Sequence, residues 1–384
     1  MFSFRFIFLC FFICITGSGF SQHKSGTVIH VSRGTGIKKD TFSNKTPGPV
    51  ARPAVTAHID AVCSKLSALL EAQKFSEFAP LLRKSLQQFP GNARLMELKK
   101  QFVIKDYKAN VLKQQYLSED KYFEKQPSSQ SCHPGTVNAL GHSIVLQRLN
   151  YIRRLAGLYD SCVFDPELNK KCQAAAHMMD ANNHLDHSPK SNWKCYSKDG
   201  ASAAGSSNLS LGYAFVDALM GQMTDDGSGN AACGHRRWIL NPYNNVFGHG
   251  STANAMTLSV FGSANPKLVK KTGFSDSGFV SWPTADYFPA DLMPERWSFS
   301  YADADFSQAK VTVSLNGKPL KVRLEPVKNG YGMNTVVWVV DGTVQADKVY
   351  TVSISNVKIV KGWGKRATTS VRNFAYKVTP LTIE

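Results

Sequence analysis

The sequence of 384 residues predicts a multidomain α+β protein. Apolar residues recur at helical spacing in residues 55–126, helix and strand patterns are mixed in residues 134–266, and the period changes to two in residues 275–384. The length also exceeds the roughly 250 to 300 residues at which a single hydrophobic core stops growing. We therefore expect three folded parts after an N-terminal leader.

Residues 1–21 have the layout of a secretory signal peptide. A charged start with Arg5 precedes an apolar run from Phe6 to Thr16, and small residues follow as far as Ser21. The apolar run is shorter than the roughly 20 residues that cross a bilayer, so we expect cleavage and no transmembrane segment afterwards. Residues 22–54 are rich in Lys, Ser, Thr, Gly and Pro and are predicted to be a disordered linker.

A signal peptide predicts a secreted protein, in the extracellular space or in a periplasm, where cysteines form disulfides. Six of the eight cysteines follow the signal, enough for up to three bridges. These six contain no CxxC pair, so zinc-ribbon and thioredoxin-like sites have no support.

The net charge of +17 is interpreted mainly as the solubility of a basic exported protein, with an anionic surface as the alternative partner. Because the basic residues are spread along the chain without a long run, we expect no nucleic-acid partner.

Two helices are predicted at the start of the N-terminal part. Apolar residues spaced by three or four from Ile59 to Leu69 predict the first, and Ser76 can cap a second that has Pro80 in its first turn. Residues 69–92 resemble a tetratricopeptide (TPR) hairpin. Because one such unit cannot bury a core alone, we interpret residues 55–126 as an accessory TPR-like segment with a third helix.

The C-terminal part alternates like a β protein. Apolar residues alternate in Val311–Leu315, before an Asn316-Gly317 turn, and again in Leu320–Leu324 after it. This pattern predicts a hairpin. Trp338 lies in a further strand and is expected in the core. The strand spacing over residues 275–384 predicts an immunoglobulin-like (Ig-like) β-sandwich.

Two helices are also expected in the middle part. Gly157 is placed to end the first, and Asp165 followed by Pro166 is placed to begin the second. Short strands are predicted at residues 246–250 and 256–262.

The middle part also contains a set of short motifs in a fixed order. They are Leu149-Asn150-Tyr151-Ile152-Arg153, His187-Ser188-Pro189, Gly205-Ser206-Ser207-Asn208-Leu209, Cys233-Gly234-His235-Arg236-Arg237-Trp238 and Val246-Phe247-Gly248-His249-Gly250. Together they resemble the CAP superfamily of cysteine-rich secretory, antigen 5 and pathogenesis-related 1 proteins, also called SCP domains, in its bacterial form. The resemblance implies an α-β-α sandwich around an antiparallel sheet over residues 134–266.

The resemblance also implies a cleft that holds two histidines and two glutamates. His187 and His235 match the histidines, whereas Ser207 and Gln222 occupy the glutamate positions, and Asn208 follows in the first glutamate motif. We expect these five residues to form a ligand cleft. Without carboxylates the cleft is a poor zinc site and lacks an obvious general base, so no catalytic residue is assigned. Zinc bound by His187 and His235 is the alternative.

Four aspartates could replace a missing carboxylate, namely Asp186, Asp217, Asp225 and Asp226, but the sequence places none of them in the cleft. The basic pair Arg236-Arg237 is interpreted as solvated charge beside packing contacts, with a cationic rim for an acidic ligand as the alternative.

Two disulfides are proposed, and the first of them would tie together two strands of the cleft. Cys233 directly precedes Gly234-His235, as in many members of the superfamily, and Cys195 ends the loop that carries His187, so these two are one candidate pair. Cys162 and Cys172 flank the start of the second helix and form the next pair. The connectivity stays open, because six cysteines allow 15 pairings.

Three functions are compatible with this sequence. The first is a non-catalytic secreted protein that binds a lipid, glycan or peptide in the cleft. The second is a metal-dependent hydrolase acting on wall or protein substrates, and the third is a structural adaptor of the cell envelope. Since GxSxG, HExxH and P-loop motifs are absent from the sequence, the binding protein is favoured.

Overall fold

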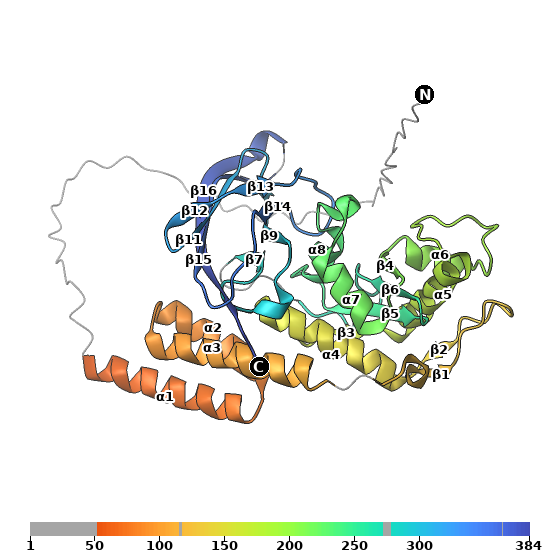
Figure 1. Ribbon diagram of the computed structural model, residues 1–384, viewed down its shortest axis with the longest axis horizontal. Coiled ribbons are helices and arrows are strands. Elements are labelled where there is room, and N and C mark those ends of the chain that lie inside the picture. The colour runs from red at the N-terminus through yellow and green to blue at the C-terminus, as the bar shows by residue number, and fades with distance from the viewer. Residues whose placement is uncertain (1–51, 115–116, 272–277, 363) are drawn as a thin grey trace, which may run out of the picture. The chain divides into compact units, whose positions relative to one another are not determined.

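The computed structural model describes residues 52–114, 117–271, 278–362 and 364–384 (Figure 1). The predicted signal peptide and most of the predicted linker lie outside these residues. Within them the protein is α+β, with separate helical and β-sheet parts. None of the helices in the described ranges is both long enough and apolar enough to span a membrane.

The N-terminal part consists of three helices. They are α1 (Arg52–Glu71), α2 (Phe75–Gln88) and α3 (Ala93–Tyr107). The first helix begins at Arg52 and therefore includes the last three residues of the predicted linker. The predicted start of the second was wrong, because Ser76 lies inside α2 and donates its hydroxyl hydrogen bond to Asp160. As a result Pro80 lies in the helix interior and not in the first turn.

Short elements connect these helices to the middle part. They are the π-helical turn η1 (Lys108–Leu112), the 3₁₀ helix η2 (Glu119–Tyr122) and the paired strands β1 (Phe123–Lys125) and β2 (Thr136–Val137).

The middle part contains five helices and a four-stranded sheet. The helices are α4 (Ala139–Leu155), α5 (Pro166–Asn182), α6 (Lys198–Ala204), α7 (Phe215–Thr224) and α8 (Gly234–Ile239), with the 3₁₀ helix η3 (Ser228–Asn230) before α8. The strands are β3 (Val163–Phe164), β4 (Ser207–Leu211), β5 (Val246–Ser251) and β6 (Ala255–Ser259), in the order β3-β5-β6-β4. The sheet is antiparallel except for the β3–β5 pair, which is parallel.

The starts and stops of its first two helices follow the predicted signals. Gly157 has a φ of 73° just after α4. At the start of α5, Asp165 accepts the N–H of Glu167 as N-cap and Pro166 is the first helical residue.

Helices cover both faces of this sheet. Met256 and Leu258 of β6 belong to the core that includes residues of α4 and α7, whereas Ala255 of the same strand packs with α5 and α6. Alternate residues of a strand point to opposite faces, so the sheet lies between two helical layers. Gly250 allows α5 to approach β5, because a Cβ there would lie 2.2 Å from the backbone nitrogen of Gln173.

The C-terminal part contains two sheets. One has the order β12-β11-β15-β16-β8, with β10 also paired to β15, and the other has the order β13-β14-β9-β7. The strands are β7 (Phe279–Trp282), β8 (Asp286–Pro289), β9 (Arg296–Tyr301), β10 (Ala304–Asp305), β11 (Lys310–Leu315), β12 (Lys318–Leu320), β13 (Val322–Leu324), β14 (Thr335–Val340), β15 (Tyr350–Lys361) and β16 (Thr368–Leu381). Two 3₁₀ helices complete it, η4 (Ala290–Leu292) and η5 (Gly364–Arg366).

The predicted hairpin forms, with Asn316 and Gly317 both in the left-handed region. Its second strand differs from the prediction, because the chain leaves one sheet at Leu320 and joins the other at Val322. Trp338 is fully buried, as expected.

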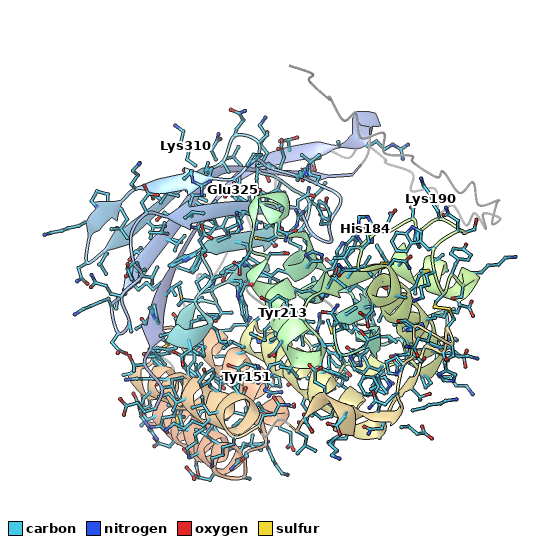
Figure 2. All side chains as sticks on the ribbon, turned by 45° about the vertical axis from the view of Figure 1, so that its right-hand side comes forward. Tyr151, His184, Lys190, Tyr213, Lys310 and Glu325 are labelled. Atoms are coloured by element: carbon cyan, nitrogen blue, oxygen red, sulfur yellow. A yellow bond between two sulfur atoms is a disulfide. The ribbon has the colours of Figure 1, made fainter. Side chains whose placement is uncertain are left out.

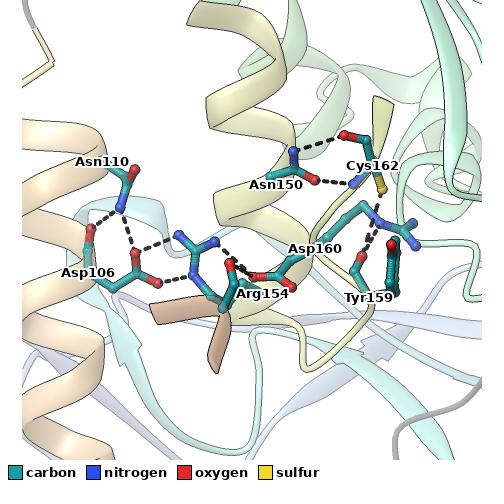
Figure 3. Close-up of polar contacts among 9 residues, drawn as sticks. Asp106, Asn110, Asn150, Arg154, Tyr159, Asp160 and Cys162 are labelled. Atoms are coloured by element: carbon teal, nitrogen blue, oxygen red, sulfur yellow. Dashed lines mark hydrogen bonds and ion pairs between the residues drawn. The ribbon is translucent and has the colours of Figure 1, made fainter. Parts of the chain in front are cut away.

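A buried ion-pair cluster joins the helical part to the middle part (Figure 3). The guanidinium of Arg154 on α4 donates to both carboxylate oxygens of Asp106 on α3, at 2.8 and 2.7 Å, and to Asp160 at 2.9 Å. Burial alone would lower the pKa of Arg154, but the hydrogen bonds to the two aspartates outweigh it and raise this pKa.

The cysteine pairing differs from both proposed pairs. Cys195 forms its disulfide with Cys132, and Cys63, Cys162, Cys172 and Cys233 are buried thiols. A Cys162–Cys172 bridge cannot form, because the first thiol packs in the α4 core and the second in the α5 core across the sheet. Cys233 precedes the first residue of α8, and its thiol is buried and unpaired.

Candidate functional site

A pocket of about 190 Å³ lies at the beginning of the edge strand β4. It is lined by His187, Ser207, Asn208, Gly229, Asn230, Ala232, Gly234, His235, Trp238, Lys328 and Tyr331. Four of the five predicted cleft residues therefore reach one pocket. This volume is below the roughly 300 to 1,000 Å³ of pockets for drug-sized molecules, so it suits one group of a larger ligand.

The ring of His187 is fixed through one nitrogen. Its Nδ1 lies 2.7 Å from the carbonyl oxygen of Ala204, the last residue of α6. A carbonyl oxygen only accepts, so Nδ1 carries a proton and the lone pair of the neutral ring is on Nε2. His187 is therefore an oriented acceptor, although it lies on an exposed part of the loop.

The ring of His235 is held in the same way by a carboxylate. Its Nδ1 donates to Oδ1 of Asp225 at 2.6 Å, while Oδ2 of Asp225 accepts the backbone N–H of Arg236 at 3.1 Å. Asp225 is only 1% exposed and ends α7 in the left-handed region. The side chain of His235 is 27% exposed and lines the pocket in front of this carboxylate.

Gln222, at the second glutamate position, contacts Asn208, which follows Ser207 in the first glutamate motif. Asn208 donates through Nδ2 to the carbonyl oxygen of His235 at 3.1 Å and to Oε1 of Gln222 at 3.3 Å. Gln222 in turn donates to the hydroxyl of Ser210 at 2.9 Å. Gln222 is thus buried behind the pocket wall, whereas Ser207 and Asn208 form part of that wall. The roles of these residues in binding stay predictions.

The interpretation of Arg236 and Arg237 as solvated charge was wrong, since both side chains are buried. Arg236 donates to the carbonyl oxygen of Arg296 on β9 at 2.7 Å, and Arg237 donates to those of Lys328 and Met333 at 2.7 and 2.8 Å. Neither forms a rim. The two guanidiniums attach α8 to the C-terminal sheets.

Two wall residues come from the C-terminal part and were not predicted. Lys328 and Tyr331 lie between β13 and β14, in the loop whose carbonyl groups bind Arg237. The ring of Tyr331 packs on Gly234, where a Cβ would lie 3.0 Å from a ring carbon. The small residue before His235 therefore lets this ring form part of the pocket.

The donor set fits zinc poorly. Two imidazoles line the pocket with neutral side chains, and the carboxylate of Asp225 is already occupied by hydrogen bonds behind His235. Across the described ranges, no three His, Cys, Asp or Glu side chains gather in a metal-binding group. Structural zinc sites use four ligands and catalytic ones three, so two imidazoles do not make a competent centre.

A second, larger pocket of about 340 Å³ lies away from the histidines. Its wall combines α2, α3 and the end of α4 with β7 and β8, and includes the apolar residues Leu82, Phe102 and Phe279. It contains no histidine or cysteine. Polar groups line both pockets, since Lys99 and Asp286 form an ion pair in the wall of the larger one, but only the histidine pocket brings together residues of the predicted cleft.

No curated protein matches the chain. Residues 146–259 match the model of the CAP family, described as the cysteine-rich secretory protein family. The match covers α5 to β6 and thus both histidines, but not Lys328 or Tyr331. The fold and this match together support a CAP domain in the middle of the chain.

Proposed function

We propose that this chain is an exported, non-catalytic binding protein of the bacterial CAP type, which holds one group of a lipid, glycan or peptide ligand in the histidine pocket. The TPR-like helices and the Ig-like sheets would then be flanking parts that support the pocket or extend its reach. The CAP family itself suggests an extracellular binding module.

One observation carries this proposal. His187 and His235 line one pocket and each has its Nδ1 fixed by a hydrogen bond, so both rings offer an oriented Nε2 to a ligand. No Asp or Glu is among the residues that line the pocket, so its wall holds no carboxylate to complete a metal centre for hydrolysis. A site built in this way can orient a ligand through two imidazoles, whereas a metal-dependent hydrolase would need further ligands.

The test is calorimetry on the full chain with three probes, namely the uncharged trimer of N-acetylglucosamine, trialanine, and phosphatidylglycerol vesicles. We expect at least one probe to bind the wild type. Replacement of both histidines, His187→Gln with His235→Gln, should weaken that binding by about tenfold or more, as expected for the loss of two oriented hydrogen bonds. The matched control is His184→Gln, because His184 is an exposed histidine of the same loop that does not line the pocket (Figure 2).

Two results would contradict the proposal. The first is binding that the double variant leaves unchanged. The second is cleavage of the sugar or the peptide, detected by mass spectrometry and stopped by a chelator, which would favour the metal-dependent hydrolase.

A further inference from the structure

The guanidinium of Arg237 is buried without a carboxylate partner. Its side chain is 4% exposed and donates to the backbone carbonyls of Ala232, Lys328 and Met333. No acidic residue in the described ranges forms an ion pair with it, in contrast to Arg154, which has two aspartates. Because carbonyl groups solvate a guanidinium but do not cancel its charge, Arg237 leaves a positive charge inside the protein.

This charge lies directly behind the pocket wall. Two of its carbonyl acceptors belong to Ala232 and Lys328, which line the pocket. The guanidinium carbon also lies 5.4 Å from the ring centroid of Tyr331, another wall residue. Water screens a charge poorly through such a thin layer of protein, so the field of Arg237 reaches the pocket.

The wall adds a further positive charge. The described residues include no acidic partner for the ammonium group of Lys328 within ion-pair distance, and none of the lining residues is acidic. The nearby Asp225 has each oxygen engaged, by His235 and by the backbone of Arg236. These hydrogen bonds do not cancel the charge of Asp225, so two cations, Arg237 and Lys328, lie in or behind the pocket wall against this one anion.

We propose that the pocket binds an oxyanion group, a carboxylate or a phosphate, of its ligand. Lys328 and the hydroxyl of Tyr331 are the donors to the anion, and the field of Arg237 stabilises its charge. A hydroxyl or N–H beside the anionic group can donate to Nε2 of His187 or His235. The inference rests on the proposed binding function and narrows the ligand to an acidic one.

The experiment uses the full chain at pH 7 and small probes that match in shape. Inorganic phosphate and acetate test the two sources of the oxyanion, and acetamide is the neutral counterpart of acetate. We expect saturable heats of binding with one or both anions and none with acetamide. The anion that binds more tightly identifies the source, phosphate or carboxylate.

Variants assign the anion to this pocket. Lys328→Gln should weaken binding of the anion by about fivefold to tenfold, as expected for a hydrogen bond to a charged group. Lys318→Gln is the matched control, because Lys318 is an exposed lysine on β12 outside the pocket and its loss changes the net charge equally. The control should change the affinity by less than about twofold, the range of a screened surface charge.

The inference fails if neither anion binds, if acetamide binds as well as acetate, or if both lysine variants weaken binding equally. The last result would indicate adhesion to the basic surface as a whole. Failure of the inference about an acidic ligand is distinguishable from failure of the proposed binding function. If the histidine double variant loses an uncharged probe while phosphate and acetate do not bind, the binding function stands and the acidic ligand does not.

Discussion

Nδ1 of His142 on α4 lies 3.0 Å from Nδ1 of His249 on β5. One ring must donate and the other accept, so this contact requires at least one ring to be neutral. Burial lowers the pKa of His142 to about 4, and burial together with the charge of a protonated His142 lowers the pKa of His249 well below its usual value. The two rings therefore make folding dependent on pH.

The first prediction is a loss of stability in mild acid. An unfolded histidine titrates near pH 6.5, so below this pH the unfolded chain binds more protons than the folded one, and stability falls as pH falls towards the folded pKa of about 4. His142 alone should lower the free energy of unfolding by about 2 kcal/mol between pH 7.5 and pH 5.

Urea unfolding at the two pH values measures this change. His142→Asn should reduce the difference between them, whereas His184→Gln should leave it as in the wild type, because His184 is exposed. An unchanged pH dependence in His142→Asn would show that the pair is not responsible.

The second prediction concerns the ion-pair cluster at the junction of α3 and α4. Arg154→Met removes the partner of Asp106, whose side chain is 2% exposed, and leaves a buried carboxylate uncompensated. We expect the free energy of unfolding to fall by about 3 to 5 kcal/mol. Lys74→Met breaks an exposed pair with Glu77 and should cost no more than about 1 kcal/mol. Equal effects of both substitutions in urea unfolding would refute the difference between buried and exposed pairs.

The third prediction concerns the cysteines. In the native protein iodoacetamide should modify none of the four buried thiols, because the thiolate is the reactive form and burial raises the pKa of Cys172 to about 12. In denaturant without a reductant, mass spectrometry should find four modified cysteines among the described six. Reduction of Cys132–Cys195, which are 63 residues apart, should lower the free energy of unfolding by about 4 kcal/mol. A mapped Cys195–Cys233 peptide would contradict this pairing.

Local signals in the sequence were sufficient to predict where several helices and turns begin and end. Asp165 with Pro166, Gly157, and Asn316 with Gly317 each determine the backbone within a few residues, and each acts as predicted. Contacts between residues that are far apart in the sequence could not be predicted from such local signals. Cys132 meets Cys195 only because two loops converge, and nothing in the sequence ranks that pair above the other combinations.

The residues of the histidine pocket were likewise predictable only where a local motif marks them. The motifs indicated His187 and His235, because each stands beside its own recognisable neighbours. Asp225 was one of four candidates, and its contact with His235 depends on a φ of 54° that the Asp225-Asp226-Gly227 sequence favours but does not require. Lys328 and Tyr331 are about 90 residues from His235 in sequence and have no motif of their own. Only the folded chain brings them to the pocket.

The attachment of α8 to the C-terminal sheets limits how the protein can be dissected. A fragment cut just after β6 would contain both histidines but would lose the carbonyl oxygens of Arg296, Lys328 and Met333. Its two arginines would turn towards water, and one side of the pocket would be missing. A ligand screen on such a fragment would report on a different site, so the whole chain is the reagent that such a screen requires.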